Sequence, residues 1–322
     1  MMIRILALGG IGVAMAMAQS AAPKPVEQAK PAAGVKAATR ATGSKYTPPK
    51  TPWGEPDLQG LWPINHLIAV PLVRPKNLGE KFLLNDEEFA KQQEAIKARN
   101  ARLRGPIPAA DAPDRAMRQT SLIVDPKDGQ FPALTDYGKK LQAEMKSSYK
   151  PGQTVFDAVE DFAAWDRCIT RGMPVSMLPR NYNNGIRIIQ SPGFVVITVE
   201  MAHEARVIPT TNMPPLDPKI RQWMGEPRGH WEGNTLVVES KNFNGLVGLT
   251  SAGVPGSPGP LQPATSEIRF VERLTRVGPE EIEYSMTIED PATLAPGHYT
   301  VQYPMYLDNK YEMYEYACHE GN

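Results

Sequence analysis

The sequence lacks the common signatures of catalysis and cofactor binding. It has no Gly-x-Ser-x-Gly nucleophile motif, no His-Glu-x-x-His helix, no phosphate-binding loop and no dinucleotide fingerprint. Of its five histidines, no two fall at the spacing of metal ligands. We therefore expect no metal and no cofactor, so any chemistry has to come from ordinary side chains.

An excess of one charge and long apolar runs are also missing. The chain has 35 basic and 35 acidic residues, which removes any general argument for nucleic acid or an anionic membrane surface as a partner. After the N-terminus no apolar run approaches the about 20 residues that span a bilayer. We expect a soluble mature protein with no integral membrane segment, whose partner is a small molecule. The oligomeric state is left open.

Residues 1–18 have the pattern of a cleavable signal peptide. Arg4 supplies the positive start, Ile5 to Ala14 are mostly apolar, and Ala16-Met17-Ala18 places small residues at the cleavage site. The alternative is a retained anchor, but the apolar run is shorter than the about 20 residues an anchor needs. The sequence therefore predicts cleavage before Gln19 and a periplasmic or secreted protein.

Cysteine is scarce, with Cys168 and Cys318 as its two examples. In an exported protein two cysteines favour one disulfide. Its loop of about 150 residues would contribute roughly 4 to 5 kcal/mol in chain-entropy models. The alternatives are a reactive thiol pair, for which no Cys-x-x-Cys is present, and a metal site that would also need His319.

Composition divides the rest of the chain into a tether and one domain. Residues 19–50 are rich in Ala, Pro and Lys with few large apolar residues, which predicts a disordered tether. Residues 51–322 then form a single β-rich domain. The 32 prolines of the chain argue against a helical bundle, because they require many loops and short elements.

Helical segments are expected between about residues 85 and 171. Asn85 and Glu88 have the spacing of a reciprocal cap for a helix over 86–104. Thr135 predicts a second helix through Ser147, and residues 157–170 a third. A short helix over 217–224 begins with proline in its first turn.

Beyond Gly185 the apolar pattern changes to the period of two that is typical of strands, with Gly, Pro and Asn turns between them. A first strand is expected near residues 56–62. The later expected strands are residues 186–190, 194–201, 205–209, 229–232, 235–240, 267–276, 281–290, 299–307 and 311–318. Such an antiparallel meander closes into a barrel or packs as two sheets. We expect a lipocalin-like barrel, with the helical N-terminal segment packed against it.

Five runs of this sequence resemble a large family of exported, mostly uncharacterised β-rich proteins of environmental bacteria. The runs are residues 51–60, 167–172, 220–225, 229–239 and 314–322. The ending Tyr-Ala-Cys-His-Glu-Gly-Asn is the most specific of them. The resemblance implies export and one continuous domain, and it carries no catalytic assignment.

Strand parity singles out one acidic residue. Glu272 falls between Phe270 and Leu274 on the strand face that is expected to be apolar. A buried carboxylate is costly unless it is paired. Glu272 is therefore either half of a buried ion pair with an arginine, a residue turned outward by a bulge, or a pocket base.

Other polar clusters lie at strand ends, at the Tyr182-Asn183 turn and around the expected disulfide. Exposed turns and structural salt bridges are the alternative explanations. The candidate catalytic residues are Glu272, His319 and Arg171. The candidate ligand-binding residues are Tyr182, Asn183, Glu200, His203, Arg206, His230 and Tyr316.

Residues 245–266 form a Gly- and Pro-rich loop of a length that is uncommon inside a compact domain. We expect this loop to be mobile and to cover a cavity. The function that follows is binding of a small organic ligand, sugar-derived or aromatic. If the protein is an enzyme, a carboxylate, a histidine and an arginine would suit a cofactor-independent lyase or isomerase. The alternatives are a non-catalytic ligand-binding or envelope-interaction protein and a structural protein with a filled barrel.

Overall fold

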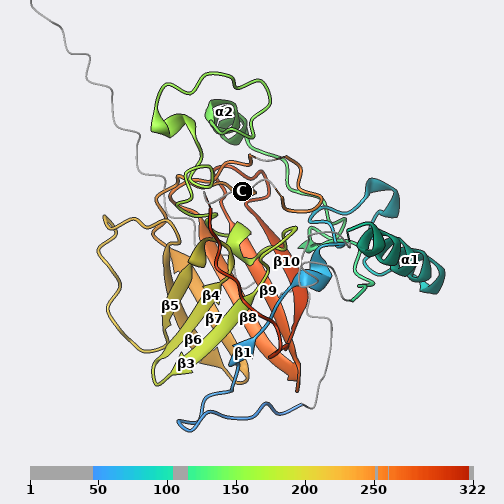
Figure 1. The fold of residues 1–322 in the computed structure, drawn as a ribbon. Helices are drawn as coiled ribbons and strands as arrows, with labels where there is room; N and C mark the ends of the chain where they lie inside the picture. The colour runs from blue at the N-terminus through green and yellow to red at the C-terminus, as the bar shows by residue number, and fades with distance from the viewer. Residues whose placement is uncertain (1–45, 104–114, 251–252, 260, 319–322) are drawn as a thin grey trace, which may run out of the picture. The chain divides into compact units, whose positions relative to one another are not determined.

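The strands form two antiparallel sheets, of four and six strands (Figure 1). The computed structural model describes residues 46–103, 115–250, 253–259 and 261–318. All of these belong to one compact unit spanning residues 37–322. The expected signal peptide, the tether up to residue 45 and His319 lie outside the described residues. The last residues of the expected tether are placed, and Lys50 already pairs with Pro56.

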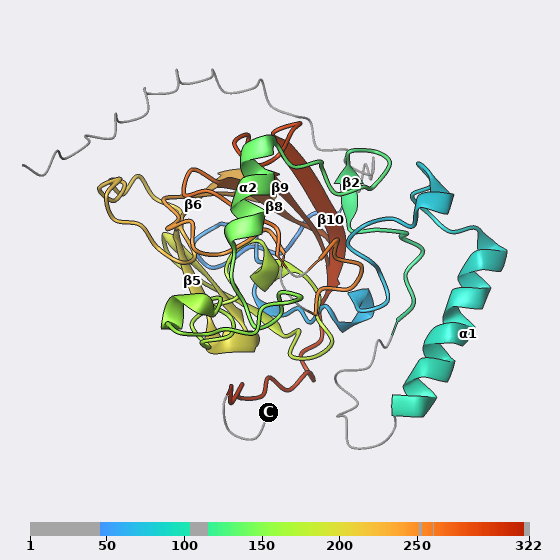
Figure 2. The same ribbon diagram turned by 90° about the horizontal axis from the view of Figure 1, so that it is seen from above.

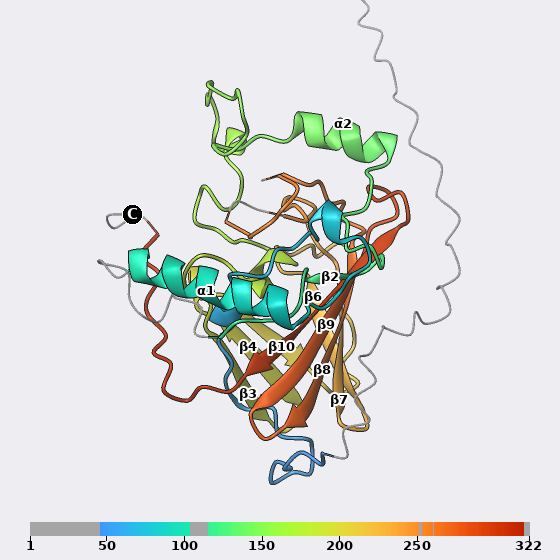
Figure 3. The ribbon, with the colours of Figure 1, turned by 90° about the vertical axis from the view of Figure 1, so that its right-hand side faces the viewer.

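The larger sheet is a meander with the strand order β2-β10-β9-β8-β7-β6 (Figure 3). Its strands are β2 (Ile123–Asp125), β6 (Glu226–Glu232), β7 (Thr235–Lys241), β8 (Arg269–Gly278), β9 (Glu281–Glu289) and β10 (His298–Tyr306). Alternate residues of β8 and β9 are buried, as the period of two predicts. Leu236, Leu274 and Tyr284 face each other across three strands and are all fully buried.

The smaller sheet has the order β1-β3-β4-β5. Its strands are β1 (Gly60–Leu61), β3 (Ile186–Ser191), β4 (Phe194–Val199) and β5 (Ala205–Pro209). Ile188, Ile197 and Ile208 bury their side chains in the core shared with the larger sheet. The irregular segments around Trp62 and Met177 join that core, so it is built from loops as well as strands.

The expected barrel closure is not found, because no hydrogen-bonded ladder joins the two sheets among the described strands. β5 and β6 run close together. The Ile208 side chain lies so near Gly229 that a Cβ on Gly229 would be 3.0 Å from Ile208 Cγ2. Pro209 and Pro227 each remove a backbone N–H at this seam, which hinders pairing. The two sheets therefore lie next to each other here without forming a closed barrel.

Two of the expected α-helices are confirmed. α1 (Asp86–Leu103) begins with the predicted reciprocal cap, since Glu88 N–H donates to Asn85 and Asn85 N–H donates to Glu88, both at 2.9 Å. α2 (Asp136–Glu144) is capped by Thr135, whose hydroxyl accepts from Gly138 N at 2.9 Å. α2 lies against loops beyond the strand ends, where Gln142 donates to the Leu261 carbonyl (Figure 2). No helix in the described part of the chain is long and apolar enough to cross a membrane.

Three expected elements are wrong. Residues 157–170 form turns and one 3-10 turn, because Asp161 and Asp166 accept from nearby backbone N–H groups in place of a helix. Residues 217–224 are irregular, since Gln222 pairs with Phe243. Residues 311–317 form no strand. The 3-10 turns of the structure are Asn65–Leu67, Lys76–Leu78, Val159–Asp161, Val175–Met177 and Met201–His203.

Candidate functional site

A pocket of about 350 Å³ lies between residues 141–171 and the loop of residues 245–264. The apolar part of its wall includes Met145, Phe162, Trp165, Val247, Leu261 and Pro263. Its charged wall residues are Glu144, Lys146, Glu160, Asp166, Arg167 and Arg171. An apolar concavity with a few polar groups is the usual form of a small-molecule site, and this volume is within the usual range.

Arg171 is the buried cation of the pocket wall, with 6% of the residue exposed. Its guanidinium carbon lies 4.1 Å from the centroid of the Trp165 ring, and one Nη donates to Met201 Sδ at 3.3 Å. Burial lowers the pKa of Arg171 to about 10, while Tyr182 and Tyr316 partly offset that shift. Arg171 therefore stays charged at neutral pH, and its guanidinium stacks on the Trp165 ring in a cation–π contact.

Several other charges of the wall are engaged in structural contacts. Asp166 accepts from the Ser147 hydroxyl, the Ser148 hydroxyl and N–H, and the Ala163 N–H, at 2.9 to 3.0 Å. Lys146 pairs with Asp161. These bonds fix the irregular segment that replaced the expected helix, and that segment forms one side of the pocket.

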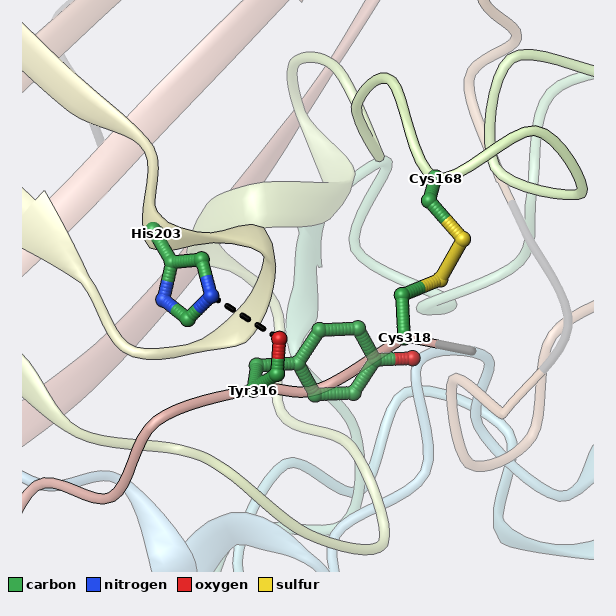
Figure 4. Close-up of a disulfide and its surroundings, with 4 residues drawn as sticks. All are labelled: Cys168, His203, Tyr316 and Cys318. Carbon is green, nitrogen blue, oxygen red and sulfur yellow. Dashed lines mark hydrogen bonds between the residues drawn. A yellow bond between two sulfur atoms is a disulfide. The ribbon is translucent and has the colours of Figure 1, made fainter. Parts of the chain in front are cut away.

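The disulfide Cys168–Cys318 is formed, with 6.1 Å between the Cα atoms, as the sequence predicts. It fastens the C-terminal segment to the loop that carries Cys168 (Figure 4). Tyr316 stacks on Trp165 with ring centroids 5.6 Å apart, and His203 Nε2 donates to the Tyr316 carbonyl at 2.8 Å. The bridge thus supports the aromatic residue on which Arg171 is stacked.

Glu200 holds the same segment from the other side. Its carboxylate accepts from the Tyr311 hydroxyl at 2.6 Å, the Tyr314 N–H at 2.8 Å and the Gly185 N–H at 2.9 Å. Asn183 Nδ2 adds a fourth bond at 3.2 Å. Glu200 is buried, and these donors satisfy it, so its evident role is to anchor the C-terminal segment.

Glu272 points into the core, as its parity predicts, and is fully buried. It forms an ion pair with Arg206 of β5, whose Nη1 donates to Oε1 at 2.9 Å and whose Nη2 donates to Oε2. The Tyr284 hydroxyl also donates to Glu272 Oε1, at 2.8 Å. Burial lowers the pKa of Arg206, but the Glu272 carboxylate outweighs it and the pKa ends above its usual value. The pair joins the two sheets and is not part of the pocket wall.

Another buried arginine, Arg180, lies close to Arg171. It donates to the carbonyls of Val175 and Ser176 at 3.4 and 3.1 Å. Burial, and then the charge of Arg171, lower the pKa of Arg180 to about 9. Glu204 faces this group and accepts from the Ser176 hydroxyl at 2.7 Å and from the Thr170 hydroxyl. Burial raises the pKa of Glu204.

The structure gathers most of the predicted site residues and separates the others. Arg171, Tyr182, Asn183, Glu200, His203 and Tyr316 lie around the C-terminal segment. Glu272 and Arg206 form the core pair. His230 lies on β6, exposed and 3.3 Å from Glu232. His319 lies outside the described residues, so its predicted role stays a prediction.

The loop of residues 245–266 does border a cavity, as predicted. Leu249 is fully buried and its N–H donates to the Gln262 carbonyl at 2.7 Å, while Leu72 N–H donates to Pro255 at 2.7 Å. The described parts of the loop are therefore packed onto the domain. Its predicted mobility stays a prediction.

Trp165 and Glu204 are the site residues that the candidate set missed. The helix expected over residues 157–170 contains Trp165, and helical spacing would set the direction of its side chain. The useful signal was the disulfide, because a bridge brings the neighbours of both cysteines together. Trp165 and Tyr316 each lie within three residues of a cysteine, and they stack on one another.

No group of His, Cys, Asp and Glu among the described residues could hold a metal ion. No family model, no curated protein and no solved structure matches this chain. The resemblance of its five runs to exported bacterial proteins therefore stays a prediction, and the site has to be interpreted from its own geometry.

Proposed function

We propose that this protein binds a small organic ligand, aromatic or sugar-derived, in the pocket beneath residues 245–264. The observation that carries the proposal is the pocket itself, with its apolar wall and one buried guanidinium. A volume of about 350 Å³ suits a ligand with one or two rings. Tyr149 and Leu246, both exposed, also belong to the pocket wall and offer further apolar contact.

The disulfide supports a periplasmic or secreted location, since such bonds persist in oxidising compartments. It also supports binding in a more direct way. Cys168 lies between Arg167 and Thr170, which both line the pocket, so the bridge stiffens the wall. A stiff wall lowers the entropic cost of binding a ligand.

Binding has more support than lyase or isomerase chemistry. Acid–base catalysis needs a titratable group within hydrogen-bond reach of the substrate. Glu272 is committed to Arg206 in the core. Of the acids that line the pocket, Asp166 accepts four structural hydrogen bonds, and Glu144 and Glu160 are exposed. Glu204 contacts the wall residue Thr170, and both its hydroxyl partners come from structural turns. We therefore propose a binding protein. Catalysis would be proposed only if a bound ligand were found to be converted to a product.

A pocket-filling variant tests the proposal. Ala163 lines the pocket and is half-buried, so Ala163→Trp should fill the space that a ligand needs. Ala205→Trp, at an exposed position of β5, is the matched control. Ligand-observed NMR with a panel of single-ring aromatic compounds and monosaccharides should show binding to the wild type and to Ala205→Trp, lost in Ala163→Trp. Binding that survives in Ala163→Trp would place the ligand elsewhere.

A further inference from the structure

The charged side chains of the pocket wall balance one another. Among the described residues, the wall carries three cationic and three anionic side chains, which are Lys146, Arg167, Arg171, Glu144, Glu160 and Asp166. Their formal charges therefore cancel. A charge that leaves water costs free energy unless an opposite charge balances it. A ligand with a net charge of its own would upset this balance, so the wall as a whole favours an uncharged ligand.

The serine and threonine hydroxyl groups of the described wall already donate within the protein. A ligand with many hydroxyl groups, such as a sugar, would have to compete with these bonds or leave its own polar groups without partners, which is costly in a site that excludes water. The three donations run from Ser147 to Asp166 at 3.0 Å, from Thr170 to Glu204, and from Thr250 to the Gly259 carbonyl at 2.9 Å.

Two aromatic rings of the wall are held in place by neighbouring rings. Phe162 stacks on Phe156 with the ring centroids 4.6 Å apart and 21° between the ring planes. Trp165 stacks on Tyr316 and carries the guanidinium of Arg171. Side chains that are already ordered lose little conformational entropy when a ligand arrives. A ligand ring gains edge-to-face or offset-stacked contacts with such rings, which a saturated ring of the same size does not offer.

We infer that the ligand of this pocket is an uncharged aromatic compound, whose ring lies between Phe162 on one side and Val247 and Leu261 of the loop on the other. The inference rests on the proposed function and narrows its two ligand classes to one. The pocket separates residues 141–171 from the loop of residues 245–264, and both sides contribute apolar side chains to its wall. A flat ring can contact both sides at once, and its binding needs no free hydrogen-bonding group in the wall.

Five probes test the charge and the ring separately. Ligand-observed NMR titrations of the disulfide-bonded protein near neutral pH would use methyl benzoate, benzoate, benzylamine, methyl cyclohexanecarboxylate and methyl glucoside. We expect methyl benzoate to bind about two- to tenfold more tightly than its saturated analogue, which is the range that aromatic contacts give. It should bind about tenfold or more tightly than the two charged probes and the sugar, because each of these loses hydration that the wall does not replace.

A matched pair of variants then locates the ring. Phe162→Leu keeps an apolar side chain in the wall and removes the aromatic face, so the affinities for methyl benzoate and methyl cyclohexanecarboxylate should become about equal. Retained binding of methyl cyclohexanecarboxylate shows that the pocket is still folded. Phe131→Leu is the control, since Phe131 is also half-buried but packs on Tyr299 at 5.1 Å, outside the described wall. It should keep the wild-type ratio of the two affinities.

The outcomes separate this inference from the proposed function. Benzoate or benzylamine binding as tightly as methyl benzoate overturns the uncharged class and leaves a small-molecule pocket in place. Equal wild-type affinities for methyl benzoate and its saturated analogue overturn the aromatic class, as does tighter binding of methyl glucoside. A wild-type ratio in folded Phe162→Leu overturns the position of the ring. If no probe binds, the inference falls, and the wider panel on Ala163→Trp decides the proposed function. If Phe162→Leu does not fold, the wild-type affinities decide alone.

Discussion

Arg206 and Arg171 are buried to a similar degree, at 2% and 6% exposure, in two very different settings. Arg206 lies between the sheets, donates to both oxygens of Glu272 and reaches the Ser240 hydroxyl at 3.3 Å. Arg171 lies at the pocket, stacked on Trp165 and beside a methionine sulfur. One guanidinium forms an ion pair between the two sheets, and the other stacks on a ring in the pocket wall.

The difference follows from the elements that carry each residue. Regular strands bring β5 and β8 residues face to face at fixed spacing, so a complete ion pair can form inside the core. The pocket is built from irregular segments fixed by side-chain caps and one disulfide. Burial alone therefore does not distinguish the two arginines, whereas the elements around each guanidinium and its access to a cavity do.

The largest expected effect is at the core pair. Glu272→Gln removes the carboxylate and leaves Arg206 buried without its counter-charge, which should cost about 3 to 5 kcal/mol of unfolding free energy. Denaturant unfolding would measure it. Ligand binding at temperatures where the variant is folded should be unchanged, because Glu272 does not border the pocket.

Glu239→Gln is the matched control for that variant. Glu239 pairs with Arg269 on the exposed side of the sheet, and losing such a pair should change stability by about 1 kcal/mol or less. If Glu272→Gln unfolded like the wild type and lost the ligand, the distinction between the two arginines would be wrong.

Removing the disulfide should have the next largest effect and should act on the pocket. The bridge spans 150 residues, and losing a native disulfide typically costs about 2 to 5 kcal/mol. The double variant Cys168→Ser/Cys318→Ser should also bind ligand more weakly, because Tyr316 is no longer held against Trp165. Denaturant unfolding and calorimetry check both effects.

Adding a reductant is the control, since it should weaken the wild type and leave the double variant unchanged. Wild-type affinity in the double variant would show that the C-terminal segment holds its place without the bridge.

A smaller effect is expected where the loop meets the pocket wall. Gly172 has φ +68°, and a Cβ there would lie 2.7 Å from the Val247 side chain. Gly233, in the β6–β7 turn, has φ +60° and open space around it. In both variants an alanine must adopt the left-handed backbone conformation, which lowers the free energy of unfolding by about 1 kcal/mol or more.

Gly172→Ala should lose more stability than Gly233→Ala, and it alone should weaken ligand binding, because Val247 lines the pocket. Thermal unfolding and calorimetry of the two variants give the comparison. Equal losses of stability in both variants would mean that the loop of residues 245–266 moves to make room for the added methyl group.

The smallest effect is spectroscopic. Burial raises the pKa of Tyr316 to about 12, and Tyr182 adds to the shift. The folded protein therefore keeps this proton where the unfolded chain loses it, near pH 10. The stability contributed by Tyr316 is complete below about pH 10 and is lost as the pH rises towards 12.

Ultraviolet titrations of the wild type and of Tyr316→Phe would check this. The difference between the two absorbance curves should show phenolate only near pH 12. The same titration in urea is the control, where the difference should appear near pH 10. A folded-state transition near pH 10 would show that Tyr316 is not packed against Trp165.

Local patterns in the sequence determined most of the strands, the caps of both helices and the direction of key side chains. Alternation put Glu272 on the same face as Phe270 and Leu274, and that face is buried. Asn85 and Glu88 specified the start of α1, because a cap needs only residues three positions apart. Because the chain has two cysteines, one disulfide pairing was possible. The length and composition of the loop of residues 245–266 indicated a segment that borders a cavity.

Tertiary structure decided everything that depended on distant partners. Local alternation gives the buried face of a strand, but sheet closure depends on whether β5 and β6 can form a ladder. Residues 157–170 had a helical pattern, yet Asp161 and Asp166 found backbone partners that favoured turns. Parity showed that Glu272 points inward, and only the packing of the two sheets gave it Arg206. Arg171 instead received Trp165 and a cavity, because the irregular segment of residues 141–171 packs beside the loop of residues 245–264.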